Sequence, residues 1–162
     1  MTPIRIPLVE IERRHLAVQR RMADAGLDAI LVLQNADLFY LTGSIQAGVL
    51  YLPAEGPAVY LVRRDLARAR VESPIDRILP FRSPKELVPL LAETGLPLPR
   101  CAGMELDVVP VTLFDRYRKA LPGCDLKDAS SLLRAVRAVK SPFERTIQAS
   151  AAVVAARIVE RV

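Results

Sequence analysis

Histidine and cysteine, which often bind zinc or act as nucleophiles and bases, are almost missing from this sequence. The 162 residues include one histidine, two cysteines and no tryptophan. His15 has no HxxxH or CxxC spacing beside it that would complete a metal site. We therefore expect His15 to be a packed or rim side chain. We also expect the chain to contain no catalytic residue and no metal site of its own.

Long apolar runs are missing as well. No run approaches the ~20 residues that a membrane-spanning helix needs, and the amino-terminal segment lacks the apolar core of a signal peptide. Cys101 and Cys124 lack the short spacing of a paired site, which predicts free, buried thiols in a reducing compartment. These absences favour a cytoplasmic chain with no membrane partner.

Catalytic motifs and concentrated charge are also absent. The sequence contains no G-x-S-x-G nucleophile turn, no phosphate-binding loop and no G-x-G-x-x-G fingerprint. Its net charge of +5 comes from arginines spread along the chain, mostly near Asp or Glu, without the aromatic signature of a nucleic-acid-binding module. We expect no nucleic-acid partner, although the arginines leave open a basic patch formed in the folded chain.

A few carboxylates remain as possible acid or base residues. These are Asp37, Glu105 and Asp107. A cap or surface role is the better interpretation for each of them, because aspartate in particular is favoured at helix caps and turns.

The rest of the sequence alternates between helical and strand patterns. Apolar spacing predicts helices over residues 8–25, 64–72, 83–94, 110–121 and 130–136, with a short helical turn over 35–41. Short apolar runs predict strands over residues 28–33, 48–52, 58–62, 77–79, 100–105 and 124–127, the last at a sheet edge. Residues 53–57 join two of these strands as a hairpin. We therefore predict an α/β fold whose mixed β-sheet is flanked by helices on both faces.

Two segments carry the signature of a helix start. Each has a serine, then a proline, then a glutamate three residues after the serine; they begin at Ser83 and Ser141. In such a box the serine hydroxyl accepts a hydrogen bond from the backbone N–H of the third helical residue (N3). The glutamate carboxylate accepts one from the backbone N–H of the serine. Pro89, inside the first of these helices, predicts an early bend or a tightened first turn.

The second box starts a helix with a long apolar stripe. The stripe comprises Phe143, Ile147, Ala151, Val154, Ile158 and Val162. A stripe of this kind needs a surface to pack on. The helix either folds back on its own domain or opens a second domain, and we favour the second interpretation.

Several segments resemble the creatinase, prolidase and Xaa-Pro aminopeptidase family. Residues 35–43, NADLFYLTG, are similar to the family's N-x-x-x-x-Y-L-T-G stretch, and residues 21–29, RMADAGLDA, are similar to its M-x-x-x-G-l-D-a helix-to-strand entry. Residues 137–144, RAVKSPFE, are similar to the R-x-x-K-S-p-x-E junction that leads into the family's catalytic "pita-bread" domain. The segments occur in the family's order and cover essentially the whole chain.

The resemblance implies a domain organisation. Residues 1–140 would form the N-terminal α/β domain of the family, with a ribonuclease H-like sheet. Residues 141–162 would form the first helix of a C-terminal metallopeptidase domain that is absent here. That domain would hold two divalent metal ions (Mn, Co or Zn) on an Asp, Asp, His, Glu, Glu set with no counterpart in this chain. The parent protein is then expected to be a Xaa-Pro dipeptidase or aminopeptidase that takes proline-containing peptides.

The resemblance also implies a role and partners for this chain. It would form a homo-oligomer, expected to be a dimer, and would pack on its own C-terminal catalytic domain and shape the entrance to the active site. Tyr40, Ser44, Ile45 and Gln46 would lie near the substrate, with Gln46 donating a hydrogen bond and Ile45 forming a wall, unless the loop is an ordinary surface connection. A creatinase-like amidinohydrolase as the parent, or a free-standing α/β binding or interaction module, stays open as an alternative.

Overall fold

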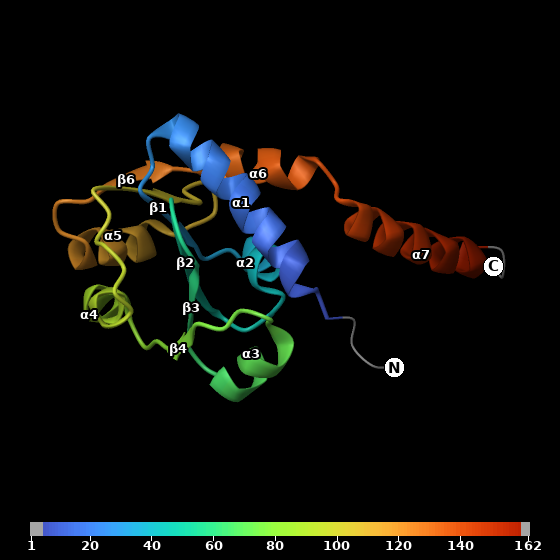
Figure 1. Ribbon diagram of the computed structural model, residues 1–162, viewed down its shortest axis with the longest axis horizontal. Helices are drawn as coiled ribbons and strands as arrows, with labels where there is room; N and C mark the ends of the chain where they lie inside the picture. The colour runs from blue at the N-terminus through green and yellow to red at the C-terminus, as the bar shows by residue number, and fades with distance from the viewer. Residues whose placement is uncertain (1–4, 160–162) are drawn as a thin grey trace.

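A mixed six-stranded sheet forms the centre of the molecule in the computed structural model, which describes residues 5–159 (Figure 1). The strands lie in the order β4-β3-β2-β1-β5-β6. In chain order they are β1 (Ala29–Val32), β2 (Gly48–Pro53), β3 (Val59–Val62), β4 (Ile78–Pro80), β5 (Cys101–Met104) and β6 (Asp125–Asp128). β2 is antiparallel to both of its neighbours, and the other pairings are parallel. Every strand except β2 therefore points in the same direction.

The helices lie where the apolar periodicity predicts them, within a few residues at each end. In chain order they are α1 (Leu8–Ala25), α2 (Asn35–Thr42), α3 (Leu66–Glu72), η1 (Pro84–Glu86), α4 (Leu87–Glu93), α5 (Val111–Ala120), α6 (Ser130–Ala138) and α7 (Pro142–Val159). α1 ends at Gly26, whose φ of 63° is the left-handed conformation that glycine adopts without strain. η1 is a 3-10 turn that leads directly into α4, which is the tightened first turn expected there.

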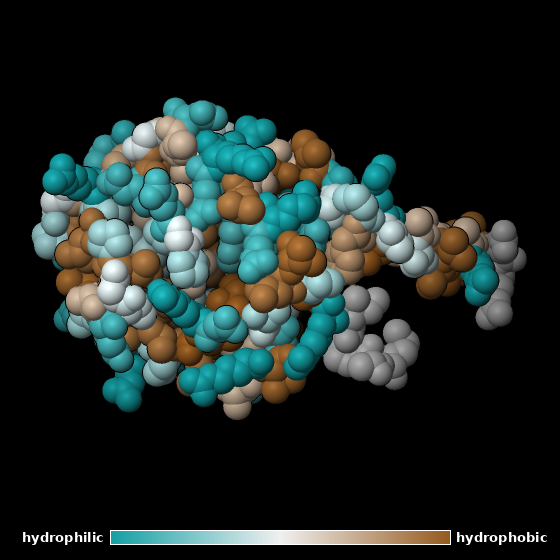
Figure 2. Space-filling view, viewed as in Figure 1, coloured by the Kyte–Doolittle hydropathy of each residue, from teal (hydrophilic) through white to brown (hydrophobic). Residues whose placement is uncertain are grey.

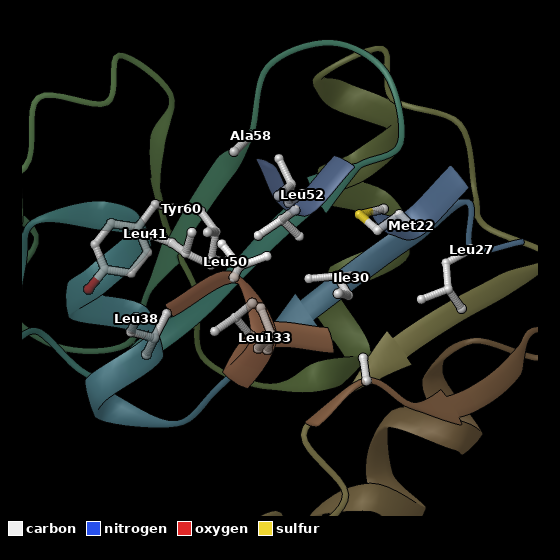
Figure 3. Close-up of a cluster of buried hydrophobic side chains, with 14 of the residues drawn as sticks. Met22, Leu27, Ile30, Leu38, Leu41, Leu50, Leu52, Ala58, Tyr60 and Leu133 are labelled. Carbon is white, nitrogen blue, oxygen red and sulfur yellow. The ribbon is translucent and has the colours of Figure 1, made fainter. Parts of the chain in front are cut away.

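The sheet separates two hydrophobic cores, because successive residues of a strand point to opposite faces. In β1, Ile30 and Val32 belong to one core, whereas Ala29 and Leu31 belong to the other. Side chains from α1, α2, α3 and α6 fill the first core, part of which is drawn in Figure 3, and side chains from α4 and α5 fill the second. The structure confirms the predicted mixed sheet with helices on both faces.

The helix-start box predicted at Ser83 is wrong. Ser83 makes no side-chain capping hydrogen bond, and the Glu86 carboxylate instead accepts the backbone N–H of Arg82 at 2.8 Å. Because Glu86 is bonded to the residue before the serine, the reciprocal pair does not form. The helix begins instead with the i-to-i+3 hydrogen bonding of η1.

α7 projects away from the sheet and its covering helices (Figure 1). No residue of α7 is buried, and brown, hydrophobic surface is visible on the projecting arm in Figure 2. Ile147 is 37% exposed and Ile158 is 62% exposed, so the helix does not fold back on this domain. Val162, the last member of the predicted stripe, lies outside the described residues. The assignment of residues 141–162 to a following domain stays a prediction.

The structure also tests the predictions about the two cysteines and about membrane-spanning helices. Cys101 and Cys124 are free, as predicted, but each is half-buried rather than buried. No helix in the described part of the chain is both long enough and apolar enough to cross a membrane.

Candidate functional site

A buried ion-pair network joins α1 to the start of α7. Arg14, only 3% exposed, lies one helical turn after Glu10. Its Nε donates to Glu10 Oε1 at 2.9 Å, its Nη1 donates to the Tyr40 carbonyl at 2.6 Å, and its Nη2 lies 3.3 Å from Glu144 Oε1. The guanidinium also lies over the Tyr40 ring, 4.2 Å from its centroid, in a cation–π contact. We call Glu10, Arg14, Tyr40, Ser141 and Glu144 the junction cluster.

Ser141 completes the junction cluster where α7 begins. Its hydroxyl accepts the Glu144 backbone N–H at 3.0 Å, and its own N–H donates to Glu144 Oε2 at 2.8 Å, which confirms the predicted helix-start box. The same hydroxyl donates to Glu10 Oε1 at 2.9 Å. Burial opposes ionisation of Glu10, but hydrogen bonds from Arg13 and Ser141 and the charge of Arg14 lower the pKa of its carboxyl. A charged and paired cluster therefore fixes the first turn of α7 to α1.

A groove opens beside the junction cluster, between α2 and the first turns of α7. It has a volume of about 440 Å³, and its lining includes Phe39, Tyr40, Arg137, Lys140, Phe143 and Ile147. Phe39 is 44% exposed, so the apolar wall of the groove is accessible. Burial of the Tyr40 ring raises the pKa of its hydroxyl, which stays protonated and can donate a hydrogen bond at neutral pH.

The loop predicted to lie near a substrate is held by Glu72, at the end of α3. Glu72 Oε2 accepts the Ser44 hydroxyl at 2.8 Å, the Ile45 backbone N–H at 3.2 Å and, more weakly, the Gln46 side-chain amide at 3.4 Å. Burial opposes ionisation of Glu72, but hydrogen bonds from Ser44, Arg68, Gln46 and Ile45 lower the pKa of its carboxyl. The loop is therefore pinned by a carboxylate that the sequence patterns do not single out.

The four residues predicted to lie near a substrate fall in two places. Tyr40 lines the groove, whereas Ser44, Ile45 and Gln46 contact Glu72 and are not among the groove residues. Ser44 is fully buried, so its hydroxyl supports the loop. Ile45 is 61% exposed and Gln46 is half-buried, so both side chains remain accessible. The nearness of these four residues to a substrate stays a prediction.

Glu105 does not have the cap or surface role expected of it. It is 1% exposed, and its carboxylate accepts the backbone N–H of Leu33 at 2.7 Å and of Gln34 at 3.3 Å. Burial raises the pKa of Glu105 to about 8, and the neighbouring Asp37 carboxylate adds to the rise. The hydrogen bonds from the two backbone N–H groups act in the opposite direction and lower this pKa. Asp37 is also buried, and it accepts Arg137 Nη1 at 2.7 Å. The signal in the sequence was the position of Glu105 at the end of a predicted apolar strand.

His15 and Asp107 have the structural roles expected of them. A ring nitrogen of His15, Nε2, lies 2.8 Å from the Leu41 carbonyl, which requires this nitrogen to carry the proton. Burial lowers the pKa of His15, so the ring is neutral at pH 7. Asp107 forms an ion pair with Arg134 at the surface. Among residues 5–159, no three or more His, Cys, Asp or Glu side chains form a group that could hold a metal ion.

The comparisons with known sequences give a family match. Residues 14–139 match the family described as the Creatinase/Prolidase N-terminal domain. Two curated relatives from Sinorhizobium fredii (strain NBRC 101917 / NGR234) are described as uncharacterized hydrolase/peptidase y4tM and y4tL. The chain is 26% identical to the first, with 94% of the chain and 44% of the relative covered, and 27% identical to the second, with 92% and 43% covered. The chain therefore spans less than half the length of these relatives.

Solved structures share the fold. Dipeptidase PepE from Mycobacterium ulcerans has a TM-score of 0.76 at 24% identity, with 98% of this chain and 45% of that chain covered. The Xaa-Pro dipeptidase from Bacillus anthracis has a TM-score of 0.73 at 18% identity, with 85% and 38% covered. The N-terminal domain of cytoplasmic peptidase PepQ from Mycobacterium tuberculosis H37Rv has a TM-score of 0.67 at 25% identity, with 76% and 98% covered.

Proposed function

Because the chain belongs to the creatinase/prolidase N-terminal domain family, we propose that it is the non-catalytic N-terminal domain of a metal-dependent Xaa-Pro dipeptidase or aminopeptidase. In this role it promotes dimerisation and shapes the entrance to an active site carried by the rest of the parent protein. The family match over residues 14–139 and the relatives described as hydrolase/peptidase support this proposal. The substrate is a proline-containing peptide, and the compartment is the cytoplasm.

The observation that carries the proposal is the contrast between the two ends of α7. Its first turn is fixed to α1 by Ser141 and Glu144, whereas its later turns expose Val153, Val154 and Ile158 to solvent. Contiguous apolar surface on a helix is characteristic of an interface. A domain that holds one end of such a helix rigidly directs the other end toward a partner surface, either the catalytic domain or a second copy.

The two divalent metal ions of the proposed parent enzyme, Mn, Co or Zn, do not fit the residues described here. A two-metal hydrolase site needs several carboxylate or imidazole ligands within reach of one another. Within residues 5–159 no such group of three or more ligands is present, and His15 already contacts the Leu41 carbonyl. The proposal therefore places the metal ions outside this chain.

An activity and binding comparison tests the proposed function. The purified chain should hydrolyse neither a Xaa-Pro dipeptide nor a matched Xaa-Ala dipeptide, and calorimetric titration with manganese, cobalt and zinc should give no stoichiometric binding. The parent protein should cleave the Xaa-Pro dipeptide only when a divalent metal is supplied. Tight metal binding by the chain alone contradicts the proposal. Hydrolysis of a creatine-like substrate by the parent points to an amidinohydrolase, and no hydrolase activity in the parent points to a binding module.

A further inference from the structure

A second hollow lies on the edge of the sheet where the carboxyl ends of its co-directional strands meet. It has a volume of about 240 Å³ and is lined by residues that come directly after β1, β3 and β4, by the start of β2, and by α5. Leu33 comes after β1, Arg63 after β3, and Arg82 after β4. In open α/β sheets, ligands bind at the carboxyl ends of the strands. None of the site residues predicted from the sequence lies in this hollow.

The charge around this hollow is of one sign. Arg63, Arg82 and Arg116 line it, and no Asp or Glu does. An adjoining hollow of about 400 Å³ shares Arg116 with it, adds Lys85 and Lys119, and also has no acidic residue in its lining. None of these five cations forms an ion pair with a carboxylate of residues 5–159. Unpaired positive charge gathered around a concave surface concentrates anions there.

The adjacent carboxylates do not neutralise this positive charge. Glu86, the acidic residue bonded to this segment, accepts the backbone N–H of Arg82 rather than its guanidinium. Asp115, on α5, pairs with Arg118 at 3.0 Å. The guanidinium groups that line the hollow therefore keep their donors for a ligand.

Tyr117 supplies an independent indication of a ligand. Its side chain is 2% exposed and packs in the second core, yet its hydroxyl makes no hydrogen bond with any residue that the structure describes. Every sealed side-chain oxygen or nitrogen in the described residues has a partner, so this hydroxyl, which has none, is not sealed, and Tyr117 is among the residues that line the hollow. Buried tyrosine hydroxyls usually find a hydrogen-bond partner. Burial raises the pKa of Tyr117, although the charge of the nearby Arg63 lowers it. The raised pKa keeps the hydroxyl protonated, so it remains a hydrogen-bond donor.

We propose that this hollow is a binding site for a small anion, recognised through its carboxylate or phosphate group by Arg63, Arg82 and Arg116 and by the Tyr117 hydroxyl. Planar guanidinium groups bind both kinds of anion through paired N–H donors. The volume is below the roughly 300–1,000 Å³ of drug-sized sites, so the occupant is about the size of an amino acid or a phosphate ester. The site does not depend on the proposed peptidase role.

Titration calorimetry on the 162-residue chain at low salt tests this site, with inorganic phosphate and N-acetylglycine as the two probes. At least one probe should bind saturably at one site, and added sodium chloride should weaken the binding. Tighter binding of phosphate identifies a phosphate ligand, and tighter binding of N-acetylglycine identifies a carboxylate. Amide NMR signals of Gly48, Arg63 and Ser83 should shift in the same titration. Failure of both probes to saturate overturns the proposal.

Matched variants separate a built site from general attraction to a basic protein. Arg116→Gln should weaken binding by about fivefold or more, because it removes a charge-assisted hydrogen bond, and Tyr117→Phe should weaken it about threefold. The control is Arg118→Gln on the same helix, which removes the same charge from a residue outside the hollow and should change the affinity less than about twofold. Equal losses in Arg116→Gln and Arg118→Gln overturn the proposal. Thermal unfolding of Tyr117→Phe should match wild type, since the hydroxyl has no internal partner.

Discussion

Glu105 shows how one buried residue ties the stability of this domain to pH. The carboxyl is 1% exposed, and its environment raises its pKa from 4.5 to about 8. Between these two values the folded chain holds a proton at Glu105 that the unfolded chain has lost. The contribution of this group to stability is therefore complete below pH 4.5 and is lost as the pH rises toward 8.

Glu105→Gln should remove this pH dependence, because glutamine keeps the shape of the protonated side chain and does not titrate. The free energy of unfolding of wild type, relative to the variant, should fall as the pH rises from about 5 to about 8, by at most ~1.4 kcal/mol per pH unit. Urea unfolding of both proteins at several pH values in this range measures the difference. A difference that stays constant across the range would show that Glu105 is ionised in the folded chain.

Gln46→Ala should impair catalysis by the parent protein if the loop lies beside a substrate. The variant should lower kcat/KM by an amount worth roughly 1 kcal/mol, the usual contribution of a neutral hydrogen bond. Folding should be unchanged, because the Gln46 amide reaches Glu72 only at 3.4 Å, whereas Ser44 bonds it at 2.8 Å. Steady-state kinetics of Gln46→Ala and Ile45→Ala provide the measurement. Kinetics equal to wild type in both variants would make this loop an ordinary surface connection.

At the scale of elements, the two serine boxes show what local sequence decides and what it does not. Ser83 and Ser141 each precede proline and have glutamate three residues later, yet only Ser141 caps its helix. Ser141 has a tertiary partner, because Glu10 on α1 accepts a hydrogen bond from its hydroxyl, whereas Glu86 accepts one from the nearby amide of Arg82. Sequence spacing identifies both candidates and cannot distinguish them.

The fold could be predicted from local sequence patterns, whereas most of the candidate site could not. The strands and helices were predictable because each buries a face whose apolar period is visible in the sequence. The junction cluster was not predictable, since Glu10 and Ser141 are 131 residues apart and no local pattern pairs them. The burial of Glu105 was not predicted, because residue propensities describe only where carboxylates usually lie. Here two backbone N–H groups that follow β1 donate hydrogen bonds to the carboxylate and hold it in the interior.

Ser141→Ala should destabilise the start of α7 by about 1–2 kcal/mol, because it removes the cap of the helix and a donor to a buried carboxylate. Ser150→Ala is the matched control, since Ser150 is exposed on the same helix and its hydroxyl donates a hydrogen bond only to the Thr146 carbonyl, one turn earlier. The control should stay within about 0.5 kcal/mol of wild type. Urea unfolding and amide hydrogen exchange at the first turn of α7 measure both effects. Equal effects in the two variants would remove the junction cluster as the anchor of α7.

At the scale of the whole molecule, the projecting helix predicts self-association. Val154 and Ile158 are 58% and 62% exposed and lie one turn apart on α7. Changing both to lysine should shift the chain from dimer toward monomer in light scattering, because it places charge on the apolar face. The fold of the single chain should be unchanged in far-UV circular dichroism, because no α7 residue is buried.

A chain ending at Lys140 provides the second arm of this experiment. It should be monomeric if α7 forms the interface. A dimer that survives the truncation would place the interface on the sheet domain, and a wild-type chain that stays monomeric at high concentration would contradict the prediction.

The long separations within the junction cluster also set an order of assembly. Proteins are made from the amino end, so Glu10 and Arg14 emerge from the ribosome long before Ser141 and Glu144. By the time these late partners arrive, the residues of all six strands have been made. Until then, Glu10 lacks its bond from Ser141, and Arg14 lacks its contact with Glu144. The contacts that anchor α7 can therefore form only late in synthesis, after the residues of all six strands have been made.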